Sequence, residues 1–398
     1  MRIMKNRILY TITAALALAS LFSGCSKQLE NKLLEPKSYF ENSFVPLEVR
    51  DEVSLEYILK TRISTPIEEE VGIDYSFGDS SDIEEYNKRH GTEYLPFPLE
   101  NASFNETKTN IPSGGIYSLD TKVTLKGLDK VEAGKVFLLP IHFEPNGSAS
   151  PIASGQTMFL ALQKPIQIKN VGHFDLSSWW SQGDWISLPR LTDETFQSVT
   201  YEALIYSNSW GSNNTVMGVE GKLIFRIGDE GGGLARNKIQ IAGNKQFHYD
   251  TGLTAKKWYH VAFTFNHETG KANIYINGKS VISSDWDQIA DMREGFAIGQ
   301  VPHFMWGTRP FNGYMSEVRL WNVARSENEI QQNMLNVDPK SKGLVVYYKL
   351  NGDDIQNVDG VWKVIDATSH GYDGIPNDGN RELKTYQLPT PLEAKDIK

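Results

Sequence analysis

Short runs in which hydrophobic and polar residues alternate recur along the first part of the chain. Residues 53–59 and 71–77 place an apolar side chain at every second position, and residues 117–125 form a further strand-like run. Residues 136–143 are apolar almost throughout. Alternation is typical of a strand with one buried face, whereas a continuous apolar run is typical of a central strand. Turn residues, as at 112–115, separate these runs, so this part is predicted to be a series of strands.

A second series of strand patterns follows after residue 220. In residues 258–265, alternate positions are apolar or aromatic and point to one face. Asn277 and Gly278 follow the apolar run 274–276 and predict a hairpin, because both central residues of a type I′ turn need a positive φ. Further strands are predicted at 223–227, 239–241, 317–321 and 345–350.

Two helix starts interrupt these strand patterns. Ser81 precedes Glu84 by three residues at the start of a short segment of mixed polar and apolar residues. Ser326 precedes Glu329 by the same spacing. This spacing is the capping box, in which the serine and glutamate side chains each accept a backbone N–H of the other residue. We therefore expect a short helix at 81–87 and another after Ser326.

The tryptophans divide the chain into two parts. All nine lie between Trp179 and Trp362. This shift indicates two domains, with the boundary near residues 164–172. About seven strands in residues 45–165 suit an immunoglobulin-like sandwich, and about a dozen in residues 170–390 suit a jelly roll of two sheets. The predicted fold class is all-β.

The N-terminal segment has the features of an export signal. A basic start is followed by an apolar run at 8–22, which is shorter than the roughly 20 residues needed to span a bilayer. The run ends in the sequence of residues 21–25, which resembles the bacterial lipobox and places the single cysteine, Cys25, at the position that is lipidated. We expect residues 1–24 to be a lipoprotein signal peptide and 25–44 to be a polar tether. An ordinary signal peptide with a chance cysteine is the alternative.

Charge and cysteine content exclude several classes of protein. The chain has 40 basic and 49 acidic residues, a net charge of −9. A nucleic-acid-binding protein would need clustered basic residues to meet the phosphates, and an electrostatic membrane anchor would need them as well. One cysteine permits neither an internal disulfide nor a cysteine-based zinc site.

Four ordered motifs carry a family resemblance in the second domain. They lie at residues 258–262, 274–278, 311–321 and 343–350. In this order they resemble the concanavalin A-like lectin/glucanase superfamily, in its laminin-G-like branch. The resemblance implies a concanavalin A-like jelly roll, a fold that carries both lectins and glycosidases.

A second resemblance concerns the first domain. Residues 85–87 and 91–96 form the centre of a stretch that resembles a domain of unknown function. That domain occurs at the N-terminus of gut-bacterial surface lipoproteins from glycan-utilisation loci. The resemblance implies a spacer, and an outer-membrane lipoprotein that faces the cell exterior and passes an oligo- or polysaccharide to a neighbouring importer.

The arrangement of acidic residues favours binding over catalysis. Retaining glycosidases need two carboxyl groups about 5–5.5 Å apart, and in jelly-roll glucanases these come from one strand with a Glu-x-Asp-x-Glu spacing. Residues 170–390 contain no such spacing on a predicted strand, and Glu317 stands alone. We therefore expect a non-catalytic, carbohydrate-binding lipoprotein. A protein-binding adhesion or scaffold lipoprotein and a glycosidase with an unrecognised carboxylate pair are the alternatives.

Three segments rich in glycine and serine combine aromatic side chains with polar ones. A sugar ring presents an apolar C–H face that stacks on an aromatic ring, while its hydroxyls need hydrogen-bond partners, since a buried unpaired hydroxyl costs roughly 1–3 kcal/mol. Because such segments are predicted to be loops, we expect them to bind the glycan. The candidate residues are Trp210, Asn213 and Asn214; His303, Trp306 and Arg309; and Trp179 and Trp180.

Other aromatic and charged residues favour a structural role. Their positions within strand patterns predict packing, although Trp210 and Trp306 remain open to either interpretation. Residues 228–233 favour a surface turn over a calcium loop, since their spacing matches no ligand set. No cofactor or metal is expected. The residues assigned to packing are Trp185, Trp258, Trp286, Trp321, Trp362 and His260.

Overall fold

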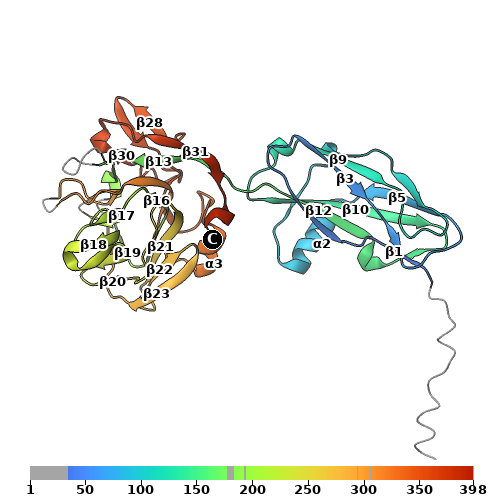
Figure 1. Cartoon of the computed structure of the whole chain (residues 1–398), viewed down its shortest axis with the longest axis horizontal. Coiled ribbons are helices and arrows are strands. Elements are labelled where there is room, and N and C mark those ends of the chain that lie inside the picture. Colours follow the sequence, from blue (N-terminus) through green and yellow to red (C-terminus); the bar gives the residue numbers. More distant parts are fainter. Residues whose placement is uncertain (1–34, 177–182, 192–193, 294, 305–306, 398) are drawn as a thin grey trace, which may run out of the picture. The chain divides into compact units, whose positions relative to one another are not determined.

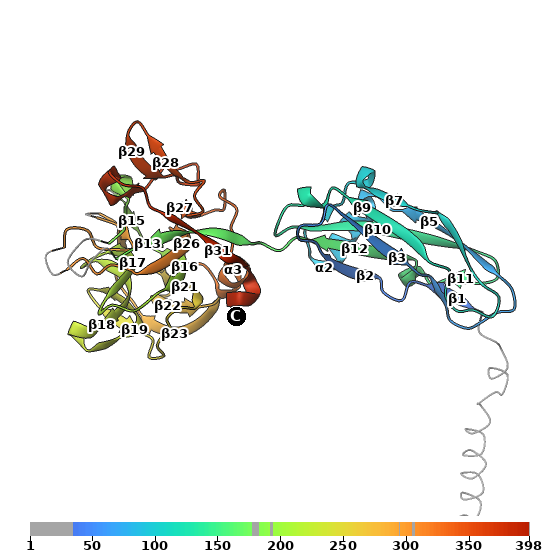
Figure 2. The same cartoon turned by 45° about the horizontal axis from the view of Figure 1, so that its top comes forward.

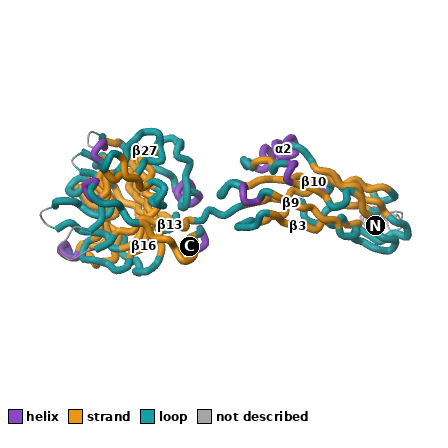
Figure 3. The backbone as a smooth tube through the Cα atoms, turned by 90° about the horizontal axis from the view of Figure 1, so that it is seen from above, coloured by secondary structure: helices purple, strands orange, loops and turns teal. Residues whose placement is uncertain are grey.

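The computed structural model describes residues 35–176, 183–191, 194–293, 295–304 and 307–397. The chain divides into two compact units, Met1–Pro165 and Ile166–Lys398. Strands make up most of the regular structure of both units (Figure 3), which confirms the all-β prediction. None of the helices in the described ranges is long and apolar enough to cross a bilayer.

The first unit is a sandwich whose sheets enclose one apolar core (Figure 1). Its largest sheet has the order β2 (Phe44–Glu48), β12 (Thr157–Gln163), β10 (Val136–Asn146), β5 (Val71–Phe77), β8 (Lys108–Ile111), with β6 (Leu95–Pro96) beside β10. A second sheet has the order β3 (Ser54–Leu59), β9 (Thr121–Lys126), β7 (Ala102–Phe104). A third has the order β11 (Ser150–Pro151), β1 (Lys37–Tyr39), β4 (Arg62–Ile63). Ile73 and Leu160 of the largest sheet share the core with Val123 of β9, and Ile73 is one of the positions that the predicted alternation buries.

The prediction of a tether at 25–44 is wrong for its last residues. Strand β1 pairs with both β4 and β11, and β2 begins at Phe44. Phe40 is 4% exposed and packs in the core of the first unit. Burial of this side chain and the pairing of β1 make residues 37–44 part of the sandwich.

The helix of the first unit begins earlier than its sequence pattern predicts. Helix α2 (Ser80–His90) has Asp79 as its N-cap, and Asp82, not Glu84, completes the capping box. Aspartate caps a helix as well as serine does, so the sequence offered two overlapping starts. Ile83 packs with Leu138 and Ala161, so α2 covers the outer side of β10 and β12.

The second unit is built from two large sheets, here called sheet I and sheet II. Sheet I has the order β23 (Lys279–Asp285), β22 (Lys271–Ile276), β21 (Trp258–Asn266), β16 (Val199–Ser207), β26 (Gly313–Trp321), β13 (Ile168–Phe174), β31 (Thr385–Leu392), with β27 (Leu344–Tyr348) beside β26. Sheet II has the order β20 (Gln246–His248), β19 (Leu234–Gly243), β18 (Leu223–Asp229), β17 (Asn214–Val219), β25 (Ala297–Ile298), β14 (Ile186–Ser187), β30 (Ile375–Pro376).

Smaller pieces complete this unit. Strands β15 (Thr195–Phe196) and β24 (Ala290–Asp291) pair with each other, and β28 (Ile355–Val358) and β29 (Val361–Val364) form the hairpin drawn in red in Figure 2. Helix α3 (Glu327–Gln332) follows β26.

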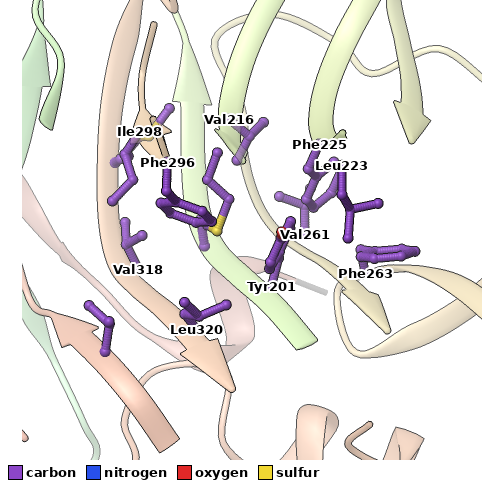
Figure 4. Packing of buried hydrophobic residues seen from close by; sticks show 14 of the residues in the cluster. Tyr201, Val216, Leu223, Phe225, Val261, Phe263, Phe296, Ile298, Val318 and Leu320 are labelled. Carbon is purple, nitrogen blue, oxygen red and sulfur yellow. The ribbon is translucent and has the colours of Figure 1, made fainter. Parts of the chain in front are cut away.

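The core of the second unit lies between sheets I and II. Figure 4 shows Tyr201 and Val261 of sheet I packed against Val216, Leu223 and Phe225 of sheet II. Val261, Leu223 and Phe225 are among the alternate positions that the sequence pattern assigned to one face of their strands. The alternation of buried and outward side chains therefore confirms the predicted sandwich.

Two local predictions are confirmed in the second unit. Asn277 and Gly278 have φ values of 52° and 75° and connect β22 to β23. Ser326 is the N-cap of α3, and its side chain and that of Glu329 form the reciprocal capping box.

Part of the outer side of sheet I is covered by the end of the chain and by the segment after α3. Leu204 of β16 shares an apolar cluster with Met334, Leu392 and Ile397. Ile168 belongs to the same cluster, so this unit extends at both ends beyond the predicted limits of 170 and 390.

Candidate binding site

Segment 208–213 connects β16 to β17 and is fixed by hydrogen bonds to the chain around Asn312. The Asn208 N–H donates to the Asn312 carbonyl (2.9 Å), and Asn312 Nδ2 donates to Ser209 Oγ (2.9 Å). On the other side, the Glu230 N–H donates to the Ser212 carbonyl (3.1 Å). The loop that carries Trp210 is therefore held on both flanks.

Trp210 is half-buried and packs against the core of the second unit. Its ring centroid lies 6.5 Å from that of the buried Phe311, with 76° between the ring planes. The indole N–H is buried without a hydrogen-bond partner in the described parts of the chain. One part of the ring thus serves packing, and its polar atom remains unsatisfied.

The two asparagines of this loop differ sharply in availability. Asn214 is 1% exposed, its Oδ1 accepts the Gly211 N–H (2.9 Å), and its Nδ2 donates to the carbonyls of Gly211 (3.0 Å) and Ile227 (2.8 Å). Its amide is used to fold the loop, so Asn214 does not offer the ligand contact that we predicted. Asn213 is half-buried, and its side-chain oxygen has no partner among the residues placed here.

Residues 299–304 and 307–311 run next to this loop, and together with 208–214 they are called the loop cluster. The Arg309 carbonyl accepts the Thr215 N–H (3.0 Å), and the Gly299 N–H donates to the Val216 carbonyl (3.0 Å). The Val301 N–H donates to the Thr308 carbonyl (2.8 Å), which closes the segment on itself. Two of the three predicted segments therefore meet on β17.

Arg309 belongs to a row of charges beside this segment. Its guanidinium forms an ion pair with Glu220, and its Cζ lies 4.8 Å from the ring centroid of Phe304. Arg226 lies in the same row, with Nη2 2.7 Å from Asp229 Oδ2. The predicted residue Arg309 is thus near the loop cluster, but much of its charge is already paired.

His303 is exposed and links the loop cluster to the chain after β30. Its Nε2 lies 3.7 Å from Asp378 Oδ2, and its ring centroid lies 6.2 Å from that of Trp185. His303 has a φ of 58°, a conformation that only a minority of non-glycine residues adopt. The side chain is accessible, as a ligand contact would require.

Gln300 is a residue of this region that the sequence did not single out. It is fully buried, and neither its side-chain oxygen nor its nitrogen has a hydrogen-bond partner within the described ranges. Nearby Thr215 Oγ and Trp185 Nε1 are in the same state. Buried polar groups are normally paired, and each unpaired group costs about 1–3 kcal/mol. The sequence around Gln300 carries no motif, so this feature emerges only from the fold.

Several predicted residues belong to parts of the chain outside the described ranges. Trp179, Trp180 and Trp306 lie outside the described residues, as does Cys25. Their predicted roles remain predictions.

The aromatic residues assigned to packing behave in two ways. Trp185, Trp286 and Trp321 are buried, with exposures of 3–4%. Trp258 and Trp362 are half-buried.

The predicted turn at 228–233 has its two acidic side chains in ion pairs. Arg226 pairs with Asp229, and Arg236 pairs with Glu230. The described residues include no cluster of side chains that could hold a metal ion.

A buried charge network lies on the outer side of sheet I and comprises Glu202, His260, Glu317, Arg319 and Arg325. Arg319 Nη1 lies 3.1 Å from Glu202 Oε2, and the same guanidinium pairs with Glu317. Arg325 Nη1 lies 2.6 Å from Glu202 Oε1, and His260 Nε2 lies 3.4 Å from Glu202 Oε2.

The two carboxyl groups of this network have opposite pKa shifts. Burial alone would raise the pKa of Glu202, but His260 and the two arginines outweigh it and hold that pKa at about 2. Burial raises the pKa of Glu317. A low-pKa base and a high-pKa acid would suit glycoside hydrolysis, yet Glu202 is 0% exposed and Glu317 is 5% exposed. The Arg319 guanidinium also donates to the Asn333 carbonyl (2.7 Å) of the covering segment. Glu202 is therefore closed off from solvent, whereas Glu317 borders a cavity of about 310 Å³ that Ser316 and Lys349 also line.

Comparison with known proteins agrees with this architecture. Residues 181–331 match the model of the concanavalin A-like lectin/glucanases superfamily, and residues 31–149 match a family of N-terminal domains. A solved structure of a candidate carbohydrate-binding protein from Bacteroides ovatus ATCC 8483 is 35% identical, with a TM-score of 0.74, over 90% of this chain and 99% of that chain. The chain belongs to the family of this Bacteroides protein.

More distant similarities concern parts of this family's fold. A pentraxin from Limulus polyphemus is 13% identical with a TM-score of 0.33, over 41% of this chain and 81% of its own. Domain 4 of an arabinanase from Geobacillus stearothermophilus, in complex with arabinotriose, is 16% identical with a TM-score of 0.29, over 36% and 69%. Similarities of this size carry no argument about function. No curated protein sequence matches the chain.

Proposed function

We propose that this protein binds carbohydrate through its second unit and does not cleave it. The observation that carries the proposal is the 35% identity, over nearly the whole of both chains, to the candidate carbohydrate-binding protein from Bacteroides ovatus. The concanavalin A-like fold of residues 181–331 supports it, since lectins are built on this fold.

The loop cluster is the surface that we assign to this function. It combines the half-buried ring of Trp210 and the exposed ring of His303 with the half-buried polar side chains of Asn213 and Arg309. Sugar hydroxyls both donate and accept hydrogen bonds, so they complement such a mixture of groups. An aromatic ring offers the apolar partner for the C–H face of the sugar.

The proposal of a non-catalytic role draws on the charge network. Glu202 and Glu317 are a carboxyl pair of sheet I whose pKa values diverge, and Glu202 has no exposed surface. A glycosidic bond therefore cannot reach both carboxyl groups, although Glu317 borders a cavity. This favours recognition over hydrolysis by these two residues.

We further propose that the protein acts at the cell surface. The lipobox-like sequence before Cys25 supports a lipid anchor, and the acyl chains of such an anchor contribute about 0.8 kcal/mol per buried CH₂. The first unit would then be a spacer, and the bound oligo- or polysaccharide would pass to a neighbouring outer-membrane importer.

Calorimetric titration of the purified full-length protein against a panel of plant and host glycans tests the proposed function. We expect binding of at least one glycan, without release of reducing sugar. Replacing the exposed His303 by alanine should weaken that binding, and W210A should weaken it further. H267A, at an exposed histidine on the loop after β21, is the matched control and should bind as the unchanged protein does.

Absence of binding to every glycan of the panel would overturn the proposal of carbohydrate binding. If a glycan binds equally well to H303A and W210A, carbohydrate binding stands but the loop cluster is not its site. Because W210A also removes core packing, its thermal unfolding must be measured, and H303A keeps the test valid if W210A is unstable.

A further inference from the structure

A cavity of the second unit lies outside the loop cluster. It has a volume of about 400 Å³ and is formed by residues 194–196, 339–345 and 369–372, with Asn322 at its side. We call it the lysine pocket, after Lys340 and Lys342. Its volume falls in the range of small-ligand sites, about 300–1,000 Å³.

The floor of the lysine pocket is apolar and its rim is polar. Phe196, Leu344 and Val345 are at most 8% exposed, and Phe196 and Val345 belong to the main core of the unit. Lys340 and Lys342 are exposed on the rim. Because the floor is part of the core, the cavity is pre-formed and needs no ordering when it is filled.

Tyr372 and Glu194 form a fixed wall of the pocket. The Tyr372 hydroxyl donates to Glu194 Oε1 (2.9 Å), and the Tyr372 N–H donates to Asp366 Oδ2 (3.2 Å). The aromatic ring is therefore held in place beside the cavity. A half-buried tyrosine ring next to hydroxyl and amide groups, here those of Ser369 and Asn322, is the combination that a sugar ring requires.

The charge around the lysine pocket is opposite to that of the chain. Lys340 and Lys342 line it, and Arg190 lies just outside, where Nη1 donates to the Gly371 carbonyl (2.7 Å). Glu194 is the one acid among the described residues that line the cavity, and its carboxylate already accepts the Tyr372 hydroxyl. In a chain with a net charge of −9, this local excess of cations favours an anionic ligand.

We propose that the lysine pocket is a second sugar-binding site, and that it takes a glycan residue that carries a negative charge. A carboxylate or a sulfate on the sugar meets Lys340 and Lys342, while the C–H face of the ring lies against Tyr372 and the apolar floor. This inference deepens the proposed function and rests on it.

Titration calorimetry of the full-length protein with trigalacturonic acid tests the proposal. The fully methyl-esterified trisaccharide is the matched neutral ligand, since it keeps the rings and loses the charge. Lactose 6′-sulfate tests a sulfate in place of the carboxylate, and sodium sulfate tests the anion without a sugar. We expect one of the charged sugars to bind about tenfold or more tightly than the neutral ligand, with an affinity that falls as salt is added.

The double variant K340A/K342A should lose about tenfold or more of that affinity. Both side chains are exposed, so the fold should be unchanged. K279A, at an exposed lysine on β23, is the matched control and should bind as the unchanged protein does.

The outcomes separate this inference from the proposed function. If neutral glycans bind but neither charged sugar binds better, or if the double variant binds charged sugars normally, the lysine pocket is not the site and carbohydrate binding stands. Sodium sulfate binding as tightly as the sugars would also overturn the inference, because the ring would then contribute nothing. Absence of binding to every glycan, neutral or charged, would overturn both the proposed function and this inference.

Discussion

Replacing Arg319 by methionine removes the cation at the centre of the buried charge network while keeping a side chain of similar length. Arg319 is 0% exposed and lies between the carboxylates of Glu202 and Glu317. Arg325 still pairs with Glu202 in the variant, but Glu317 loses its ion pair and keeps only the hydrogen bond from the Tyr347 hydroxyl (2.5 Å). A buried charge without an opposite charge beside it is among the most costly groups in a protein interior.

The expected cost follows from this arrangement. Breaking a buried ion pair by removing one partner costs about 3–5 kcal/mol, because the other charge stays buried. Burial already raises the pKa of Glu317, so this residue will take up a proton in the variant, which limits the loss. We therefore expect R319M to lower the free energy of unfolding of the second unit by about 3 kcal/mol.

Urea unfolding followed by tryptophan fluorescence measures this change in one unit alone. All nine tryptophans lie between Trp179 and Trp362, so the signal does not report on the first unit. With a slope of about 2 kcal/mol per molar urea, a loss of 3 kcal/mol moves the midpoint down by about 1.5 M.

The control is R236M, which removes an exposed arginine paired with the exposed Glu230. Exposed pairs contribute little, so its midpoint should stay close to that of the unchanged protein. A midpoint for R319M that is also unchanged would refute the conclusion that Glu317 is effectively buried, because water would then be solvating its carboxylate.

Three further outcomes are expected. Acidification from pH 7 should destabilise the second unit. Burial lowers the pKa of His260 in the folded state, so below about pH 6.5 the unfolded state binds a proton that the folded state does not, and stability falls. The stability that Glu202 contributes is lost as the pH falls from about 4.5 towards its pKa of about 2. The raised pKa of Glu317 offsets part of this loss, and the urea midpoint at each pH measures the balance. S326A removes the cap of α3 and should cost about 1 kcal/mol in the same assay, whereas an equal midpoint would show that the cap is dispensable. C25S should abolish incorporation of labelled palmitate and release the protein from the membrane fraction, and continued labelling would place the lipid elsewhere.

Local chemistry explains which parts of the fold could be predicted from the sequence. Asn277 and Gly278 specify their turn by themselves, since few other pairs adopt two positive φ values. Ser326 and Glu329 are three residues apart and satisfy each other, whatever surrounds them. The start of α2 was misplaced because Asp79 and Ser81 are both competent caps, and their sequence does not decide between them.

The remaining features depend on contacts between distant residues. Strand β1 has three residues and exists because β4 and β11 pair with it. Asn214 resembles a surface loop residue, but its Nδ2 reaches the carbonyl of Ile227 on the next strand. Glu202 and Arg319 are brought together by the pairing of β16 with β26, which no local pattern specifies. A sequence pattern predicts which side of a strand is buried, but not which strand pairs with it in the sheet.

The covered part of sheet I restricts where a glycan can bind the second unit. Leu204 and His260 face the segment after α3 and the end of the chain, so this part of the sheet is closed to a polysaccharide. The loop cluster and the lysine pocket lie outside this covered part, among the loops. A polymer that reached both would bind more tightly than a trisaccharide that fills one, since the second contact becomes intramolecular. The ratio of those two affinities would measure whether the two sites bind one polysaccharide molecule. If they do, this ratio should fall in K340A/K342A.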